Sequence, residues 1–573
     1  MRPIGEFVES SANSHPEDTL RRVVTHEVER SAGRITDCWR DANLREVRRI
    51  VAPASLPAVA APMPPQMPHM THHATTTRAL LLLGATVFFA ACLLSQPATG
   101  WNSNSRLDLV FAAVDRSTLS IDAYHNVTPT DTGDKAEYNG HYFSDKTIGV
   151  SLVAVPLYAG IRAVSKVLRL HPSFQLIQYL LTRFAVALPA ALAAMLMANL
   201  MMKLGALPRR AILATSGVFF GSLLFGYSSV FFPYLPGIAA CLGALTIVLS
   251  APLTWKKAAA AGGLLGMALI FDLTFIISVA VIGVFLLGAL RTVGIRKGLQ
   301  FGAAAAATAA VPLGAFALYS RSIFGRPTIP YTYEASQFFR DGMSKGVMGV
   351  TSPKRDAMWF LSFHAYRGIL FWSPWLVMVV ICCVWLIASD RHLRTIAIAA
   401  LVTFVGYFLF NSGYYEWWGG AGMGPRLMLP MFAIVPLGLV AACRADSPRW
   451  MRYGVVATMT VAVALCLPVS MTDPQTKQGN LLQTLLGANT GTHLRVIQLE
   501  VLKNFYLGRW IGIKPVAGIP IIVSFIGCVV LVVGGTAFAY VVAARAENHE
   551  LDDLTHSQPL DEAEPLEPVA ILA

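Results

Sequence analysis

Charged residues are scarce in this sequence. They make up 14% of its 573 residues, whereas a soluble globular protein carries about 25%. Hydrophobic residues supply 55% of the chain, and the mean hydropathy is +0.54. Apolar runs of about 17 to 25 residues, enough for a helix to cross a bilayer, recur between residues 79 and 544. The composition therefore excludes a soluble protein and predicts an all-α polytopic membrane protein.

Cysteine is missing from the segments that connect the apolar runs. Seven of the eight cysteines lie inside apolar runs, and Cys38 lies in the N-terminal segment, so neither a structural disulfide nor a cysteine metal cluster is expected. The expected outer loops also lack Asp-x-Asp, paired-His and Glu-x-x-His patterns. We therefore predict no cofactor and no catalytic metal, although the sequence leaves a single divalent ion open.

Composition divides the chain into three regions. Residues 1–78 are rich in charge, Pro and Met and are expected to form a disordered cytoplasmic extension, unless translation starts at Met70. Residues 79–544 form the transmembrane domain, and residues 545–573 form an acidic cytoplasmic tail. The net charge of +12 does not require a nucleic-acid partner, because basic residues collect in the cytoplasmic loops of membrane proteins.

About twelve transmembrane helices are expected. They lie near 79–96, 179–202, 211–232, 235–251, 258–271, 274–290, 300–319, 368–388, 395–411, 427–443, 453–471 and 518–544. A further apolar stretch at 147–164 is interrupted by Pro156 and followed by basic residues, as in a helix that lies on the membrane surface. If this stretch does not cross, the basic loops all fall on one side. The positive-inside rule then makes that side cytoplasmic, together with both termini.

Three sizeable loops, 97–178, 320–367 and 472–517, then face the extracytoplasmic side of the plasma (inner) membrane. The middles of the expected spans are almost free of ionisable groups, unlike the spans of many transporters. This distribution favours an active site at the outer face, acting on a substrate carried by a lipid. A twelve-span transporter or lipid flippase is the alternative.

Residues 105–158, which include DKAEYNGHYFSDK at 134–146, resemble the first outer loop of the GT-C glycosyltransferases. The bacterial relatives of protein mannosyltransferases and lipid A aminoarabinose transferases are the most similar. Asp145-Lys146-Thr147-Ile148 stands where that family has a D-K-P-P-like turn, without the two prolines. LTRFAVALPAAL, with Arg183, and SGYYEWWGGAGMGPRLMLP at 412–430 resemble two further family segments. Ser103 stands where better-known members carry an Asp, so a catalytically inactive relative is also an open reading.

The resemblance implies a large first loop with juxtamembrane helices. It also implies transfer of a sugar, with inversion, from a polyprenyl phosphate to a cell-envelope acceptor such as a glycolipid, polysaccharide or protein. Such a reaction needs a carboxylate that removes the acceptor's proton and cations that hold the departing phosphate. The predicted catalytic carboxylates are Asp145, Asp134 and Asp122. The predicted binding residues are Arg106, Lys135, Lys146, His141, Tyr142, Arg183, Asp272, Glu416 and Arg426.

Several of these residues also have an ordinary explanation. Asp134-Lys135 and Asp145-Lys146 can be read as solvated loop charges, and the aromatic residues of YYEWWGG as an interfacial belt. Asp108 and Asp115 are expected on a surface face of a helix. If Asp145 and Lys146 instead position the donor phosphate and the acceptor, replacing either should abolish transfer. The stability should stay nearly unchanged, because replacing a mainly solvated loop residue costs little.

Overall fold

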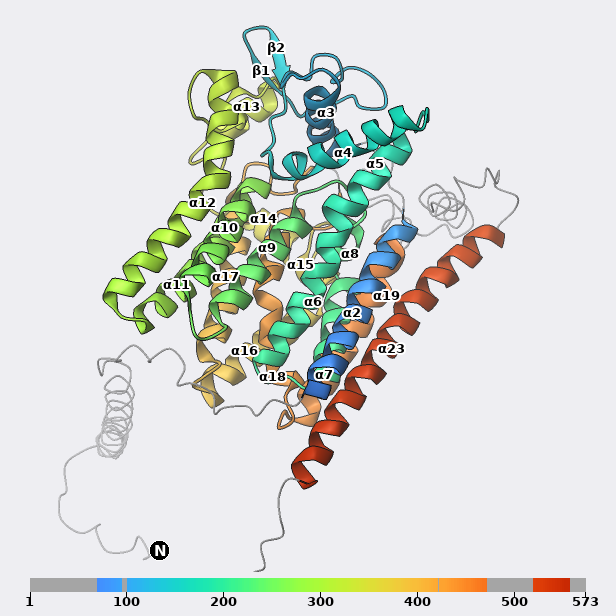
Figure 1. Ribbon diagram of the computed structural model, residues 1–573, viewed down its shortest axis with the longest axis vertical. Helices are drawn as coiled ribbons and strands as arrows, with labels where there is room; N and C mark the ends of the chain where they lie inside the picture. The colour runs from blue at the N-terminus through green and yellow to red at the C-terminus, as the bar shows by residue number, and fades with distance from the viewer. Residues whose placement is uncertain (1–69, 95–99, 421, 471–518, 557–573) are drawn as a thin grey trace, which may run out of the picture. The chain divides into compact units, whose positions relative to one another are not determined.

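Helices carry nearly all of the regular structure in the computed structural model (Figure 1). It describes residues 70–94, 100–420, 422–470 and 519–556. The loop 472–517 and nearly all of the predicted N-terminal extension lie outside the described residues. The acidic tail was predicted from residue 545, but α23 (Ile519–His556) continues through its first part.

The longer helices of the bundle lie side by side in Figure 1. They are α2 (Met70–Leu93), α6 (Leu188–Lys203), α7 (Pro208–Phe220), α9 (Tyr234–Val248), α10 (Trp255–Phe271), α11 (Ile276–Thr292), α12 (Ile295–Phe324), α16 (Trp375–Ser389), α17 (Arg394–Gly413), α19 (Arg449–Ser470) and α23. The short helices between them are α8 (Leu223–Tyr227), α13 (Gln337–Met343), α14 (Arg355–Ser362), α15 (Ile369–Trp372) and α18 (Val440–Cys443).

Eight helices in the described part of the chain are long and apolar enough to cross a membrane, or nine if one bent pair counts as a span. The sequence predicted about twelve. Part of the difference is helix length, because α9 and α16 are apolar but only 15 residues long. Elsewhere an apolar run continues past the helix inside it. The run at 211–232 is an example: α7 ends at Phe220, the carbonyl of Gly221 accepts a hydrogen bond from Trp375 Nε1, and Ser222 caps α8.

The bent pair corresponds to the predicted span at 427–443. Its two parts, Arg426–Ala433 and Val435–Cys443, meet at an angle of 53°. Pro430 and Pro436 lie in the short 3₁₀ segments of this stretch, and a proline removes a helical hydrogen bond and favours a bend. Arg426 is the first residue of the first part, and the glycine-rich loop precedes it directly.

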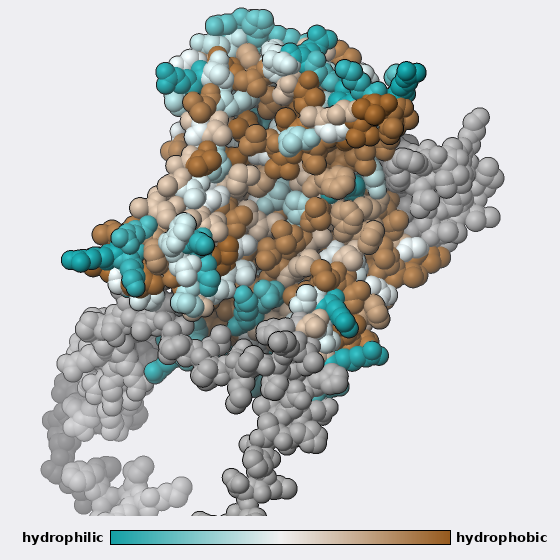
Figure 2. Space-filling model, viewed as in Figure 1, coloured by the Kyte–Doolittle hydropathy of each residue, from teal (hydrophilic) through white to brown (hydrophobic). Residues whose placement is uncertain are grey.

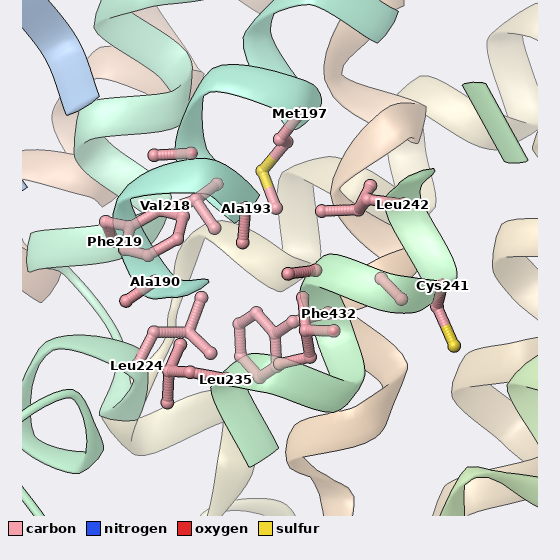
Figure 3. Packing of buried hydrophobic residues seen from close by; sticks show 14 of the residues in the cluster. Ala190, Ala193, Met197, Val218, Phe219, Leu224, Leu235, Cys241, Leu242 and Phe432 are labelled. Atoms are coloured by element: carbon pink, nitrogen blue, oxygen red, sulfur yellow. The ribbon is translucent and has the colours of Figure 1, made fainter. Parts of the chain in front are cut away.

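Small residues let the helices pack closely. Figure 3 shows Ala190, Ala193 and Met197 of α6 against Phe219 and Leu235 in the buried core. Between α10 and α12 the contact is tighter still, because a Cβ at Gly262 would lie 2.0 Å from the carbonyl oxygen of Ala305. Such small-residue contacts are typical of helices that associate within a bilayer. Figure 2 shows apolar residues around the middle of the bundle and polar residues towards its two ends.

The first predicted outer loop forms a folded cap at one end of the bundle. It contains α3 (Trp101–Asp115), a hairpin of β1 (Ala136–Tyr138) and β2 (His141–Phe143), α4 (Gly149–Val167) and α5 (Phe174–Thr182). Helix α4 covers the stretch predicted to lie on the membrane surface, and it is also long and apolar enough to span. In Figure 1 it runs across the direction of α6, at the same end of the bundle as α3. That orientation agrees with a surface helix.

Candidate active site

The hairpin and the start of α4 deliver the DKAEYNGHYFSDK stretch to the bundle. Asn139 and Gly140 form the turn with φ values of 53° and 78°, as an Asn-Gly hairpin turn requires. After β2 the chain turns inward, so that Asp145 is 1% exposed and Lys146 7%. A Cβ at Gly149 would lie 2.6 Å from the carbonyl oxygen of Ile270, so this glycine allows α4 to begin directly against the end of α10.

Lys146 lies between two carboxylates. Its Nζ is 3.0 Å from Oδ2 of Asp134, and it also contacts the carboxylate of Asp145. Ser105 of α3 donates a 3.0 Å hydrogen bond to Oδ1 of Asp145. Burial works against the charge on Lys146, but Asp134 and Asp145 outweigh it and raise its pKa well above the usual value. The ammonium group is therefore a permanent charge at neutral pH.

Glu334 from the second loop completes this group, and the sequence analysis did not select it. It is 3% exposed, and its Oε2 has no hydrogen-bond partner. The backbone of Glu334 bridges to Ala136 of β1, and the N–H of Ala335 donates to the carbonyl of Lys135 at 2.9 Å. Burial first, and then the adjacent Asp145 carboxylate, raise the pKa of Glu334 to about 10. Glu334 is therefore neutral at pH 7 and can share its proton with Asp145.

Arg106 and Asp272 form a second charged pair beside this group. Their side chains approach to 3.9 Å, and Oδ1 of Asp272 accepts hydrogen bonds from the N–H and the hydroxyl of Thr274. Arg106 is 1% exposed and also donates to Asn102, but its Nε has no partner. A buried guanidinium with an unused donor is uncommon unless an anion completes it.

Two tyrosine hydroxyls lie within electrostatic reach of several of these charged groups. The Tyr331 ring lies 5.4 Å from Lys146 Nζ, and its hydroxyl is within electrostatic reach of Asp145, Asp272 and Arg106. The Tyr234 hydroxyl at the start of α9 is likewise within reach of Arg106, Asp272 and Arg426. The first loop therefore adjoins the segment that contains Arg426.

The glycine-rich loop before Arg426 is held by Arg367, another residue that the sequence analysis did not select. Arg367 is 1% exposed and donates to the carbonyl oxygens of Gly420, Gly422 and Gly424. Each of these glycines has a positive φ, which other residues adopt at a cost. The loop can fold in this way because glycine occupies these positions.

Glu416 and Arg426 come together across this loop. A Cβ at Gly420 would lie 3.2 Å from Oε1 of Glu416 and 3.3 Å from an Nη atom of Arg426. Burial raises the pKa of Glu416, while the charge of Arg426 opposes the shift. Arg426 Nε has no hydrogen-bond partner. Arg426 is therefore a second cation, beside Arg106, with an unused hydrogen-bond donor.

Four predicted site residues lie instead on the outer side of the hairpin. Asp122 accepts from the N–H of Tyr142 at 2.7 Å, and its Oδ2 is 2.7 Å from Nδ1 of His141, which is 64% exposed. Lys135 Nζ contacts Nδ1 of His125 at 2.7 Å and lies over the Tyr142 ring. These contacts hold the hairpin against the 120–126 segment. Lys135, the sequence neighbour of Asp134, thus contacts His125, whereas Asp134 pairs with Lys146.

Arg183 lies at the junction of α5 and α6, in a π-helical turn over Arg183–Ala187. It donates to the carbonyl oxygens of Ala91 and Leu94, at 2.5 and 2.7 Å. These carbonyls lie at the C-terminal end of α2, where a cation is favourable. These contacts join Arg183 to the end of α2.

Two expectations about burial were wrong. The expected small effect of Asp145 and Lys146 on stability assumed mainly solvated side chains, but both residues are buried. Asp108 was expected on a surface face, yet it is 0% exposed. Burial raises the pKa of Asp108 to about 8. Asp115 does lie at the edge of α3, where it accepts from Tyr158 and pairs with Arg162 of α4.

The sequence held only weak signals for Glu334 and Arg367. Glu334 is the acidic residue in the aromatic segment PYTYEASQ, and Arg367 precedes the short apolar helix α15. Neither pattern is specific. Among the described residues, no group of three His, Cys, Asp or Glu side chains could hold a metal ion. The prediction that the protein uses no metal stays a prediction.

Several solved structures match most of this chain at low sequence identity. The apo crystal structure of ArnT from Cupriavidus metallidurans matches with a TM-score of 0.46 at 13% identity, over 83% of this chain and 76% of that one. The ArnT structure bound to undecaprenyl phosphate gives 0.44 at 14% identity over the same shares. The oligosaccharyltransferase AglB from Archaeoglobus fulgidus gives 0.40 at 12% identity, over 75% of this chain and 59% of AglB.

No family model and no curated protein matches the chain. With identities below 15% and TM-scores below 0.5, the function rests on the residues of the site itself.

Proposed function

We propose that this protein is a membrane glycosyltransferase that moves a sugar from a polyprenyl-phosphate donor to a cell-envelope acceptor, with inversion at the anomeric carbon. One observation carries the proposal: Lys146 is buried between Asp134 and Asp145, beside two arginines whose Nε donors are unused. An arrangement of carboxylates beside cations with unused donors suits proton removal at one point and phosphate binding at another.

The donor phosphate is assigned to Arg106 and Arg426. Arg106 is 1% exposed and Arg426 is partly exposed, and both have a buried Nε without a partner among the described residues. When the bond between the anomeric carbon and the phosphate oxygen breaks, negative charge develops on the polyprenyl phosphate. Fixed cations stabilise that charge more in the transition state than in the ground state, and so lower the barrier.

Asp134 is assigned as the base. Its side chain is 13% exposed, compared with 1% for Asp145, so an acceptor can reach Asp134 more readily. As the acceptor oxygen or nitrogen bonds to the anomeric carbon, its proton passes to the Asp134 carboxylate. Lys146 holds the Asp134 carboxylate in position through their 3.0 Å contact. Asp145 orients Lys146 from the opposite side.

Glu334 is assigned to hold a proton inside the site. A neutral Glu334 beside Asp145 prevents three buried carboxylates from repelling one another around a single ammonium group. This role does not require Glu334 to touch the substrate. It also favours a site that works at neutral pH, because the pKa of about 10 lies well above the working range.

The site is assigned to the extracytoplasmic face, with both termini in the cytoplasm. Support comes from the positive-inside distribution of the loops, and from the location of the Lys146 group in the cap at one end of the bundle. The Asp145 and Asp272 segments meet where Thr147 donates to the carbonyl of Phe271 at 2.6 Å. A donor whose lipid lies in the membrane could present its phosphate at this level.

Transfer of radiolabelled sugar tests the proposal. Purified protein in proteoliposomes is given a labelled polyprenyl-phosphate sugar and a membrane glycolipid fraction, and label in the acceptor is measured. The expected result is transfer that needs both lipids. Passage of label across the bilayer without transfer would indicate a transporter or flippase. If the label is neither transferred nor moved across the bilayer, the protein is an inactive relative, as Ser103 first suggested.

A further inference from the structure

A groove between α2 and α23 lies at the end of the bundle opposite the cap. Its volume is about 630 Å³, within the range of about 300 to 1,000 Å³ typical of ligand sites. In Figure 1, α2 and α23 run side by side, and the start of α2 lies at the end away from α3 and the hairpin. The groove is therefore separate from the Lys146 group.

Each helix lines the groove with a basic residue at one end and apolar residues beyond it. On α2 these are Arg78, Leu82 and Ala85, and on α23 they are Arg545, Val542 and Phe538. The spacings of three, four and seven residues put each set on one face of its helix. Both arginines lie at the same end of the groove, because α2 enters the bundle where α23 leaves it.

Neither arginine forms an ion pair or a hydrogen bond with another described residue. The nearest acidic residue along α23 is Glu547, which pairs with Arg209 of α7 at 3.3 Å. Two helical positions correspond to a rotation of about 200°, so Glu547 points away from the side of α23 that carries Arg545. The groove thus combines two exposed positive charges, which have no partner among the described side chains, with a mainly apolar lining.

We propose that this groove binds one anionic glycerophospholipid. The phosphate would lie between Arg78 and Arg545, and an acyl chain would lie along Leu82, Val542 and Phe538. A zwitterionic lipid has the same chains, but its headgroup carries a cation that the two arginines repel. The lipid would belong to the leaflet opposite the proposed active site, and it would join α23 to α2.

Native mass spectrometry of the full-length protein tests this site. Protein in detergent is mixed with equal amounts of phosphatidylglycerol and phosphatidylcholine of matched chains, and the lipid retained is counted. The wild type should retain one phosphatidylglycerol in preference. Arg78→Ala/Arg545→Ala should lower the preference by about tenfold, since each basic residue near a headgroup contributes appreciably. Arg78→Lys/Arg545→Lys should keep most of it.

The matched control is Arg291→Ala/Arg296→Ala. It removes the same charge from two exposed residues of α11 and α12. It should retain the wild-type preference. The proposal is overturned if the wild type shows no preference, if Arg78→Ala/Arg545→Ala keeps the preference, or if the control loses it to the same extent. None of these outcomes depends on whether the protein transfers sugar.

Discussion

Lys146 Nζ lies 3.0 Å from Oδ2 of Asp134 and also contacts the carboxylate of Asp145. The side chains of Lys146 and Asp145 are 9% and 1% exposed. One ammonium group therefore neutralises much of the charge of two buried carboxylates. Its removal should affect both the stability and the chemistry of the protein.

Lys146→Met should destabilise the protein by about 3 to 5 kcal/mol, because removal of one partner leaves uncompensated buried charge. Lys135→Met is the matched control. Lys135 contacts His125 and Asn126 near the surface, so its loss should cost at most about 1 kcal/mol. Unfolding of both variants in the same detergent measures the difference. Equal effects would contradict the burial argument.

Glu334 should make stability depend on pH. Its pKa is about 10 in the folded protein and about 4.3 in an unfolded chain. The folded state therefore holds the proton more tightly. The stabilisation is complete below about pH 4 and is lost as the pH rises towards 10.

Glu334→Gln cannot ionise and should remove this pH dependence. Melting temperatures between pH 5 and pH 9 should fall less steeply for the variant than for the wild type. The advantage of the variant should therefore grow with pH. Parallel curves would show that Glu334 does not hold its proton in the folded protein.

Gly420→Ala should weaken donor binding. The residue has a φ of 67°, and the added Cβ would enter the space between Glu416 and Arg426. Strain of about 1 to 2 kcal/mol is expected from the backbone alone. The expected result is a KM for the donor raised about tenfold. Gly160→Ala on α4, where a Cβ meets no atom within 4 Å, should leave KM unchanged.

Cysteine labelling tests which side of the membrane the cap faces. A cysteine at Gly140 in the hairpin turn should react with an impermeant thiol reagent in intact cells, whereas one at Arg296 should react only after permeabilisation. Both positions are exposed. Ala206, which topology alone would suggest as an inside position, is 6% exposed and would stay unlabelled on either side. The reverse pattern would contradict an extracytoplasmic site.

The local parts of the site could be predicted from the sequence. Asp145 and Lys146 are neighbours, so their contact needed no knowledge of the fold. The four glycines between Glu416 and Arg426 predicted a backbone that comes close to a ligand or to another part of the protein. All four have a positive φ. Pro156 and the basic residues after it indicated a surface helix, and α4 runs across the bundle.

The rest depends on contacts between distant segments. Asp134 reaches Lys146 because the hairpin register pairs Ala136 with Phe143, which brings the two ends of the stretch together. Glu334 joins the group through a bridge to Ala136. Asp122 and Asp134 look alike in the sequence, yet one lies on the outer side of the hairpin and the other beside Lys146. The number of crossings also depends on the fold, because some expected spans hold short helices, such as α9 and α16 with 15 residues each.

The most direct test of the central claim compares Asp134→Asn with Asp122→Asn in the proteoliposome transfer assay. Both variants remove one carboxylate charge from the same loop. Asp134→Asn should slow transfer at least a hundredfold, as loss of a general base typically does, while Asp122→Asn should stay within about twofold of the wild type. Near-normal transfer by Asp134→Asn, or a loss as large for Asp122→Asn, would contradict the assignment of the base to the Lys146 group.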